Sequence, residues 1–169
     1  PAGIIEKLKE HGGTLFDESL LEILEQEVTK EFRGEASVPR ILLLDPDYDV
    51  TLPLEQQLLR RDFWVHIAHN TYMAQQVLEQ QKVDLMVLEV NLGSQIDGFD
   101  FVETLREESS APPEIIFLTS RDDPDVLDRG IALARDYLIK PLSPTLASAK
   151  IKKHLEDIQR EKSQKKAPG

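Results

Sequence analysis

Short apolar runs that each end in a polar side chain are the feature of this chain that most constrains its fold. The residues that follow these runs are Asp45 after residues 41–44, Glu89 after 85–88, Thr119 after 115–118 and Lys140 after 137–139. If the runs are neighbouring parallel strands joined by right-handed crossovers, all of these polar ends lie at one edge of a sheet. That edge then holds a small acidic pocket with one hydroxyl and one ammonium group.

Apolar runs alternate with amphipathic segments through residues 40–142, which predicts an α/β fold with a parallel sheet covered by helices on both faces. The predicted strands are residues 40–44, 64–68, 85–90, 114–118 and 136–139. The predicted helices between them are residues 52–61, 72–80, 99–107 and 125–133. Three of the runs are continuously apolar, which is typical of strands buried on both faces. Ligands of such sheets bind in the crevice at the carboxyl ends of the strands.

Two single residues refine these predictions. Pro53 is tolerated in a helix only within the first turn, so we predict that the first helix of this region begins late, at Leu52. Trp64 opens the second strand, where we expect its ring to pack in the core.

Composition limits the classes of function. The chain has 169 residues, enough for one domain with extensions, and no cysteine, which excludes disulfides and thiolate metal sites. The net charge of −11 argues against nucleic-acid binding by this chain, because phosphates would be repelled. No apolar stretch approaches the roughly 20 residues needed to span a bilayer. No signal peptide is recognisable either, so we expect a cytoplasmic protein without membrane insertion.

Three regions are predicted: an N-terminal helical extension (residues 1–38), a main α/β domain (39–156), and a helix end with a disordered tail (157–169). In the extension, Gly12 and Gly13 separate two helices. The second of these helices carries an apolar stripe at helical spacing, formed by Leu20, Leu21, Leu24, Val28 and Phe32. This stripe either packs on its own domain or contacts a second copy or another protein, and the sequence leaves both alternatives open.

A long last helix is predicted over residues 143–163. Its apolar seam consists of Ala147, Ile151, Leu155 and Ile158. The seam is too short to indicate a coiled coil. Residues 163–169 are polar, and we expect them to be disordered.

The order and type of the polar strand ends resemble the phospho-acceptor receiver domain of bacterial response regulators. In that family the first strand ends in two acidic residues that carry a metal ion, and Asp45 matches the first of them. The fourth strand ends in Ser or Thr, matched by Thr119, and the fifth in Lys before Pro, matched by Lys140 and Pro141. Tyr137 falls where the family places an aromatic residue that changes rotamer on activation.

The resemblance covers about residues 40–156. A further match is Asp97-Gly98-Phe99, which is similar to the Asp-Gly turn before the third helix of the family. The resemblance implies a five-stranded parallel sheet in the order 2-1-3-4-5 with helices on both faces. To this fold the chain adds the N-terminal helical extension and the long C-terminal helix.

Two departures from the family pattern bear on the chemistry. Pro46 stands at the second acidic position and has no side-chain oxygen, while Asp47, one residue on, is expected to point elsewhere. Glu89 stands at the position of the acceptor aspartate and is longer by one carbon bond, roughly 1.5 Å. We therefore expect a metal site at Asp45 and Glu89 to be weak or absent, with no other cofactor. Because a misplacement on the order of 1 Å can cost about a hundredfold in rate, efficient phosphorylation is predicted to be lost.

These features predict an atypical receiver, or pseudo-receiver, of two-component phosphorelay signalling that is not an enzyme and acts through protein–protein contacts. Glu89 is predicted to reach Lys140, to lie close to the Thr119 hydroxyl and to imitate part of the modified state. The other interpretation is a degraded acceptor without signalling meaning. By resemblance, the partner surface runs from Asp125 to Lys153, and the N-terminal helices add a second contact or a homodimer contact.

Three alternatives compete with this prediction. One is a phosphorylatable switch that uses Asp45 or Asp47 as an unusual acceptor. The second is the front end of a longer regulator with a DNA-binding or nucleotide-signalling output domain. A hydrolase of the haloacid-dehalogenase type is disfavoured, because Pro46 interrupts the acidic pair and the chain is too short for a cap domain.

Overall fold

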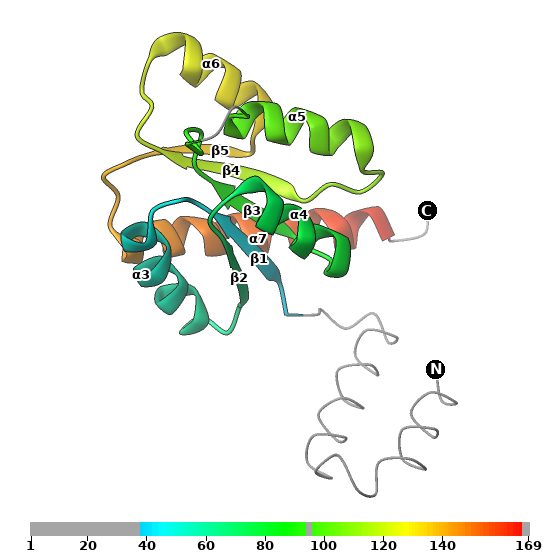
Figure 1. Ribbon diagram of the computed structural model, residues 1–169. Coiled ribbons are helices and arrows are strands. Elements are labelled where there is room, and N and C mark those ends of the chain that lie inside the picture. The colour runs from blue at the N-terminus through cyan, green and yellow to red at the C-terminus, as the bar shows by residue number, and fades with distance from the viewer. Residues whose placement is uncertain (1–37, 94–95, 167–169) are drawn as a thin grey trace, which may run out of the picture. The chain divides into compact units, whose positions relative to one another are not determined.

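The apolar runs form the strands of a single parallel sheet. The computed structural model describes residues 38–93 and 96–166, and in these ranges the sheet has the order β2-β1-β3-β4-β5 (Figure 1). The strands are β1 (Arg40–Leu44), β2 (Trp64–Ala68), β3 (Leu85–Leu88), β4 (Glu114–Thr119) and β5 (Asp136–Ile139). This confirms the predicted fold class and strand order. The predicted extension, residues 1–38, falls almost entirely outside the described residues.

Helices cover both faces of the sheet (Figure 1). One face is covered by α3 (Tyr48–Leu59) and α7 (Pro144–Lys166), and the other by α4 (Thr71–Gln80), α5 (Gly98–Glu108) and α6 (Pro124–Leu133). Alternate residues of β1 serve the two layers: Ile41 and Leu43 face α3 and α7, and Leu42 and Leu44 face the other side. All four are almost fully buried, as the continuous apolar run predicted.

The late start predicted for the first helix of the domain is wrong. Helix α3 begins at Tyr48, and Asp47 is its N-cap, accepting a hydrogen bond from the backbone N–H of Asp49 at 2.8 Å. Pro53 therefore lies inside the helix and leaves the carbonyl of Asp49 without its usual donor. Asp49 and Pro53 are both exposed, so water can satisfy that carbonyl.

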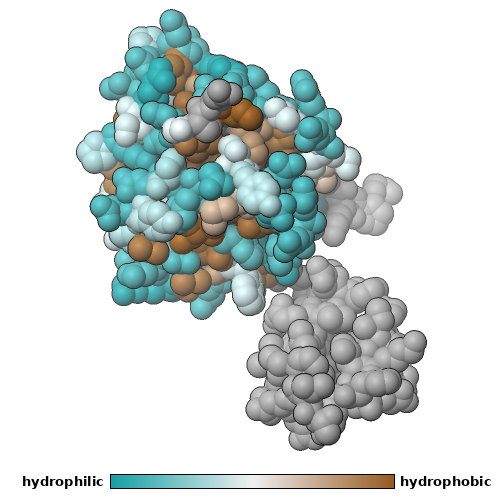
Figure 2. Space-filling view, viewed as in Figure 1, coloured by the Kyte–Doolittle hydropathy of each residue, from teal (hydrophilic) through white to brown (hydrophobic). Residues whose placement is uncertain are grey.

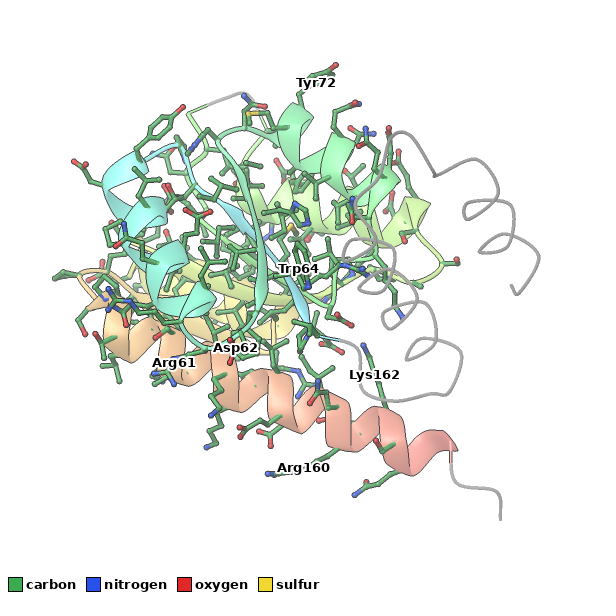
Figure 3. The ribbon with its side chains drawn as sticks, turned by 90° about the horizontal axis from the view of Figure 1, so that it is seen from below. Arg61, Asp62, Trp64, Tyr72, Arg160 and Lys162 are labelled. Carbon is green, nitrogen blue, oxygen red and sulfur yellow. The ribbon has the colours of Figure 1, made fainter. Side chains whose placement is uncertain are left out.

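The expectation for Trp64 is also wrong, because its side chain is 57% exposed (Figure 3). It lies at the first position of β2, an edge strand, beyond the cover that the helices give to the middle of the sheet. Ala68 at the other end of the same strand is fully buried. Burial along an edge strand thus depends on how far the covering helices extend, which the apolar pattern of the strand does not encode.

The last helix follows its predicted seam but is longer than predicted. The four seam residues are buried against the sheet, while α7 continues to Lys166, through part of the segment expected to be disordered. Lys162 extends from α7 toward the sheet, where it donates to Asp84 at 3.0 Å, and Arg160 lies on the outer side (Figure 3). The end of the helix is thus tied to the amino end of the sheet. Within the described residues, no helix is long and apolar enough to cross a membrane.

Candidate functional site

The structure brings together four polar side chains at the carboxyl edge of the sheet. They are Asp45 after β1, Glu89 after β3, Thr119 at the end of β4 and Lys140 after β5. Backbone hydrogen bonds extend the strand pairing into this edge: the N–H of Glu89 donates to Leu44 and the N–H of Lys140 to Thr119. The parallel register therefore holds the four residues side by side, as the position of each after an apolar run predicted.

Lys140 joins the two carboxylates. Its Nζ donates to Oδ2 of Asp45 at 2.6 Å and to Oε2 of Glu89 at 2.8 Å. The side chains are only 15%, 8% and 9% exposed for Lys140, Asp45 and Glu89, respectively. Charges so far from water must be paired to be tolerated, and each of these has its counter-charge within hydrogen-bond distance.

The second oxygen of the Glu89 carboxylate is bound by three donors. The hydroxyl of Thr119 donates to Oε1, and the backbone N–H groups of Val90 and Asn91 donate to the same atom at 2.7 and 3.0 Å. The backbone after Glu89 turns back over the Glu89 side chain, so that these two N–H groups reach its carboxylate. This turn explains why β3 ends at Leu88, two residues earlier than predicted. The chain leaves the strand at the carboxylate.

Gly98 closes the loop that follows Glu89. A Cβ at this position would lie 2.5 Å from the carbonyl oxygen of Glu89, so the two backbones approach more closely than any side chain permits. The N–H of Gly98 donates to the carbonyl of Val90 at 2.7 Å, and Asp97 caps α5. The Asp-Gly pair singled out in the sequence thus holds the start of α5 against the backbone of Glu89 and Val90.

Asp45 is held by donors on both oxygens as well. Oδ1 accepts the backbone N–H of Asp47 at 2.9 Å, and Oδ2 accepts Lys140. Nδ1 of His69 lies 2.9 Å from the carbonyl oxygen of Asp45, and the ring of His69 stacks on Tyr48 at 3.7 Å between centroids. The sequence interpretation missed this support by His69 and Tyr48, because it depends on the pairing of β1 with β2.

Burial and pairing shift the pKa values of the cluster in different directions. Burial raises the pKa of Asp45, and its bonds to Lys140 and Asp47 only partly offset this. Burial also acts to raise the pKa of Glu89, but the bonds from Lys140, Thr119 and Asn91 outweigh it and hold the pKa below its ordinary value. Burial acts to lower the pKa of Lys140, and its two carboxylate partners more than reverse this. The ammonium and the Glu89 carboxylate are therefore both charged at neutral pH.

Two further residues that the sequence singled out near the pocket, Asp47 and Tyr137, lie outside the cluster of four. Asp47 turns its carboxylate to the start of α3 as the N-cap. Tyr137 lies in β5 beside Phe117 of β4, and its hydroxyl donates to the carbonyl of Arg121 at 2.8 Å. Its ring lies against Gly130 of α6, where any Cβ would overlap it, and this slot was not predicted from the sequence.

The side chains at the sheet edge do not fit the metal ion that the resemblance to receiver domains implies. A divalent ion such as Mg²⁺ needs oxygen ligands, and here both oxygens of Asp45 and of Glu89 already accept from donors of the protein. Pro46 offers no side-chain oxygen, and the Asp47 carboxylate caps α3. Among the residues that the structure describes, no group of three acidic or histidine side chains is placed to hold a metal ion.

Two cavities bear on the choice of the site. A cavity of about 10 Å³, which is room for about one water molecule, borders Asp45 and Glu89 on the side of the core residues Leu54 and Leu118 and does not reach Thr119 or Lys140. A larger groove, of about 580 Å³, lies between α4 and α5 on the face shown in Figure 2, where hydrophobic residues show among hydrophilic ones. Its lining includes Leu78, Phe101 and Leu105 and none of the four polar residues of the sheet edge. The paired, buried charges therefore make the sheet edge the candidate site.

Comparison with known proteins identifies the class to which this fold and polar sheet edge belong. The response regulator receiver domain family matches residues 41–152. The chain belongs to this family: it is a receiver domain of two-component response regulators, which are signalling proteins.

The curated relatives that this chain matches include transcriptional regulatory proteins. The transcriptional regulatory protein AfsQ1 of Streptomyces coelicolor is 34% identical over 125 residues, which cover 73% of this chain and 54% of AfsQ1. The transcriptional regulatory protein YvrH of Bacillus subtilis is 35% identical over 119 residues, which cover 69% of this chain and 48% of YvrH. The chain thus spans about half the length of these relatives.

Solved structures show the same fold. A CheY-like receiver domain protein from Methanospirillum hungatei JF-1 superposes with a TM-score of 0.66 at 23% identity, covering 74% of this chain and 99% of that one. A two-component response regulator from Clostridium difficile has a TM-score of 0.63 at 28% identity, covering 70% and 96%.

Proposed function

We propose that this chain is an atypical receiver, a pseudo-receiver in which Glu89 stands in place of the acceptor aspartate and holds the pocket in one state without phosphorylation. The observation that carries the proposal is the double engagement of Glu89: one carboxylate oxygen accepts from Lys140 at 2.8 Å and the other from Thr119. A carboxylate at this point thus binds, from within the chain, the hydroxyl and the ammonium that an incoming phosphoryl group would need.

The charge of the pocket supports this proposal. A phosphoryl group brings a charge of about −1.5 to −2, and a receiver must neutralise it with cations and hydrogen-bond donors. Here Lys140 is already shared by two carboxylates, and Thr119 is already bonded to Glu89. A phosphoryl group would have to displace these bonds to reach the same donors.

Signalling would then proceed through a protein partner. The partner surface that we propose runs from Asp125 to Lys153 over α6, β5 and the start of α7. It exposes three large apolar side chains, those of Ile131, Ile139 and Leu146. Solitary exposed apolar residues are ordinary, but three on neighbouring elements suit a contact surface. Residues 1–37 would add a second contact or anchor the module to another component.

A second candidate function is suggested by the curated relatives. AfsQ1 and YvrH are transcriptional regulatory proteins of about twice the matched length. We propose that this receiver acts as the regulatory part of such a regulator, with DNA binding carried by a separate output domain. The two candidates are compatible, because the first concerns how the pocket is set and the second concerns what the pocket controls.

Treatment with a small-molecule phosphoryl donor and Mg²⁺, followed by intact-protein and peptide mass spectrometry, tests the proposed state of the pocket. We expect no phosphoryl group on Glu89, Asp45 or Asp47 under conditions that fully modify an ordinary receiver included in the same experiment. Stoichiometric modification of any of these three carboxylates would overturn the proposal and favour a phosphorylatable switch.

A further inference from the structure

The position of the Lys140 ammonium resembles that of a bound cation. It lies between carboxylate oxygens that come from the ends of two adjacent strands, 2.6 Å from Oδ2 of Asp45 and 2.8 Å from Oε2 of Glu89. The lysine side chain reaches this point from the end of β5, on the far side of β4, and is only 15% exposed there. A charged group so placed is fixed by its two counter-charges and is not a mobile surface lysine.

We infer that the ammonium of Lys140 is the resident cation of this acidic pair, and that it takes the place of a divalent metal ion and excludes one. This inference rests on the proposed closed pocket and adds a statement about its ligand chemistry. It makes the state of this receiver independent of the Mg²⁺ concentration.

Donor counting supports the exclusion. Each oxygen of Asp45 and Glu89 has at least one donor within the chain. Lys140 donates to one oxygen of each residue. The other oxygen of Asp45 accepts from the N–H of Asp47, and the other oxygen of Glu89 accepts from Thr119 and two backbone N–H groups. In the part of the chain that the structure describes, no buried side-chain nitrogen or oxygen lacks a partner. A metal ion would have to break these bonds and lie beside a positive charge.

Removal of the ammonium should reverse the exclusion. The Lys140→Met variant would lack the ammonium between the two buried carboxylates. In the unaltered chain the position of its nitrogen is 2.6 Å from Oδ2 of Asp45 and 2.8 Å from Oε2 of Glu89. Ca²⁺ binds oxygen at about 2.3–2.6 Å and accepts irregular geometry, whereas Mg²⁺ requires about 2.0–2.1 Å in a near-ideal octahedron. The vacated position is therefore closer to a calcium site than to a magnesium site. Mn²⁺, which also prefers oxygen ligands, provides a spectroscopic probe of the same position.

Direct titration of the unaltered chain with Mn²⁺, followed by the loss of the free-ion signal in electron paramagnetic resonance, tests the exclusion. We expect no binding at the sheet edge up to about 1 mM Mn²⁺, a concentration at which weak oxygen sites of proteins fill. Thermal unfolding in EDTA, MgCl₂ or CaCl₂ should give the same midpoint. Saturable binding of one Mn²⁺ that is lost in Glu89→Gln would overturn the inference.

The second experiment uses the Lys140→Met variant. If that variant does not fold, Lys140→Gln replaces it, because the Gln amide keeps a hydrogen-bond donor for one of the carboxylates. We expect either variant to gain a single site with a dissociation constant on the order of 1 mM, and a midpoint that rises with CaCl₂ more than with MgCl₂. The same variant combined with Glu89→Gln should lose this response. Lys150→Met is the matched control, since Lys150 is 45% exposed and pairs with Asp136 at 3.8 Å. A lysine variant that folds but gains no cation response would overturn the inference.

The two proposals fail separately. Binding of Mn²⁺ by the unaltered chain without phosphorylation would overturn only the resident-cation inference. Phosphoryl transfer to a carboxylate of the pocket would overturn the proposed function, whatever the outcome of the metal titration.

Discussion

The ammonium of Lys140 donates to Oε2 of Glu89 at 2.8 Å, which ties the end of β5 to the end of β3 across the intervening β4. This bond spans 51 residues of sequence and joins two side chains that are almost fully buried. Together with the bond from Thr119, it makes Glu89 the residue at which three strand ends meet. The stability of the sheet edge should therefore depend on this carboxylate.

Replacement of Glu89 by Ala should lower the free energy of unfolding by about 2 kcal/mol, because Thr119 and two backbone N–H groups lose a charged acceptor. The loss is not larger because Lys140 keeps its ion pair with Asp45. Urea denaturation measures this as a lower midpoint at an unchanged slope. Glu103→Ala is the control, because Glu103 is 46% exposed and shares Arg129 with Asp100; its effect should stay within about 0.5 kcal/mol. Equal midpoints for Glu89→Ala and the unaltered chain would show that Glu89 is a degraded acceptor without structural effect.

Acid should remove the contribution of Glu89. Its pKa is held below its ordinary value of 4.5 in the folded chain, so its stabilising effect is complete above that value and is lost as the pH falls through the lower folded pKa. The difference in unfolding free energy between the unaltered chain and Glu89→Gln should therefore be largest near neutral pH and shrink below pH 4.5. Denaturation curves at a series of pH values measure it. A difference that grows on acidification would contradict the direction of the shift.

Asp45 should behave in the opposite sense, since burial holds its pKa above the ordinary value of 3.8. Its charged form is therefore disfavoured by folding, and stability is regained as the pH falls through the raised pKa. We expect Asp45→Asn to destabilise the chain less at neutral pH than Glu89→Gln does. The same denaturation series tests this order, and a larger loss for Asp45→Asn would contradict it.

Gly130 should be required by the ring of Tyr137. Gly130→Ala places a Cβ in the space of that ring and should cost about 2 kcal/mol through displacement of Tyr137. In a Tyr137→Ala background the same change should instead stabilise the chain by about 1 kcal/mol, because Ala is the better helix former and the slot is empty. A double-mutant cycle by urea denaturation measures this reversal of sign. Additive effects would show that the ring of Tyr137 does not determine the cost of a side chain at position 130.

Asp62 adopts a left-handed backbone conformation, with φ of 61°, in the turn between α3 and β2. Asp62→Gly should stabilise the chain by about 0.5 kcal/mol, because relief of the left-handed strain slightly exceeds the entropy that Gly loses on folding. Arg60→Gly is the control in the same turn, where φ is −65° and Gly should only destabilise. Equal losses for both variants in urea denaturation would show that Asp62 is not strained.

The strand positions and the gathering of four polar residues at one edge could be predicted from the sequence, because both follow from apolar runs and from the parallel connection of strands. Three of the five strands, β1, β2 and β5, have the predicted bounds. The start of α3 could not be predicted in this way. Pro53 argued for a late start, whereas the helix begins where Asp47 caps it, and Asp49, whose carbonyl loses its donor to Pro53, is exposed. The exposure of Trp64 likewise depended on where the covering helices end.

The sequence by itself determined that a glutamate follows β3 and a proline follows Asp45, and these identities set which oxygens can be present at the sheet edge. The sequence also predicted that Glu89 reaches Lys140 close to Thr119 and that Asp47 points elsewhere. Only the tertiary structure decided that one oxygen of Glu89 accepts from Lys140 and the other from Thr119, and that Asp47 caps α3. The physical reason is that side-chain type is local, whereas a buried charge is stabilised by whatever donors the folded sheet places around it. Those donors come from strand ends that are 30 and 51 residues away along the chain.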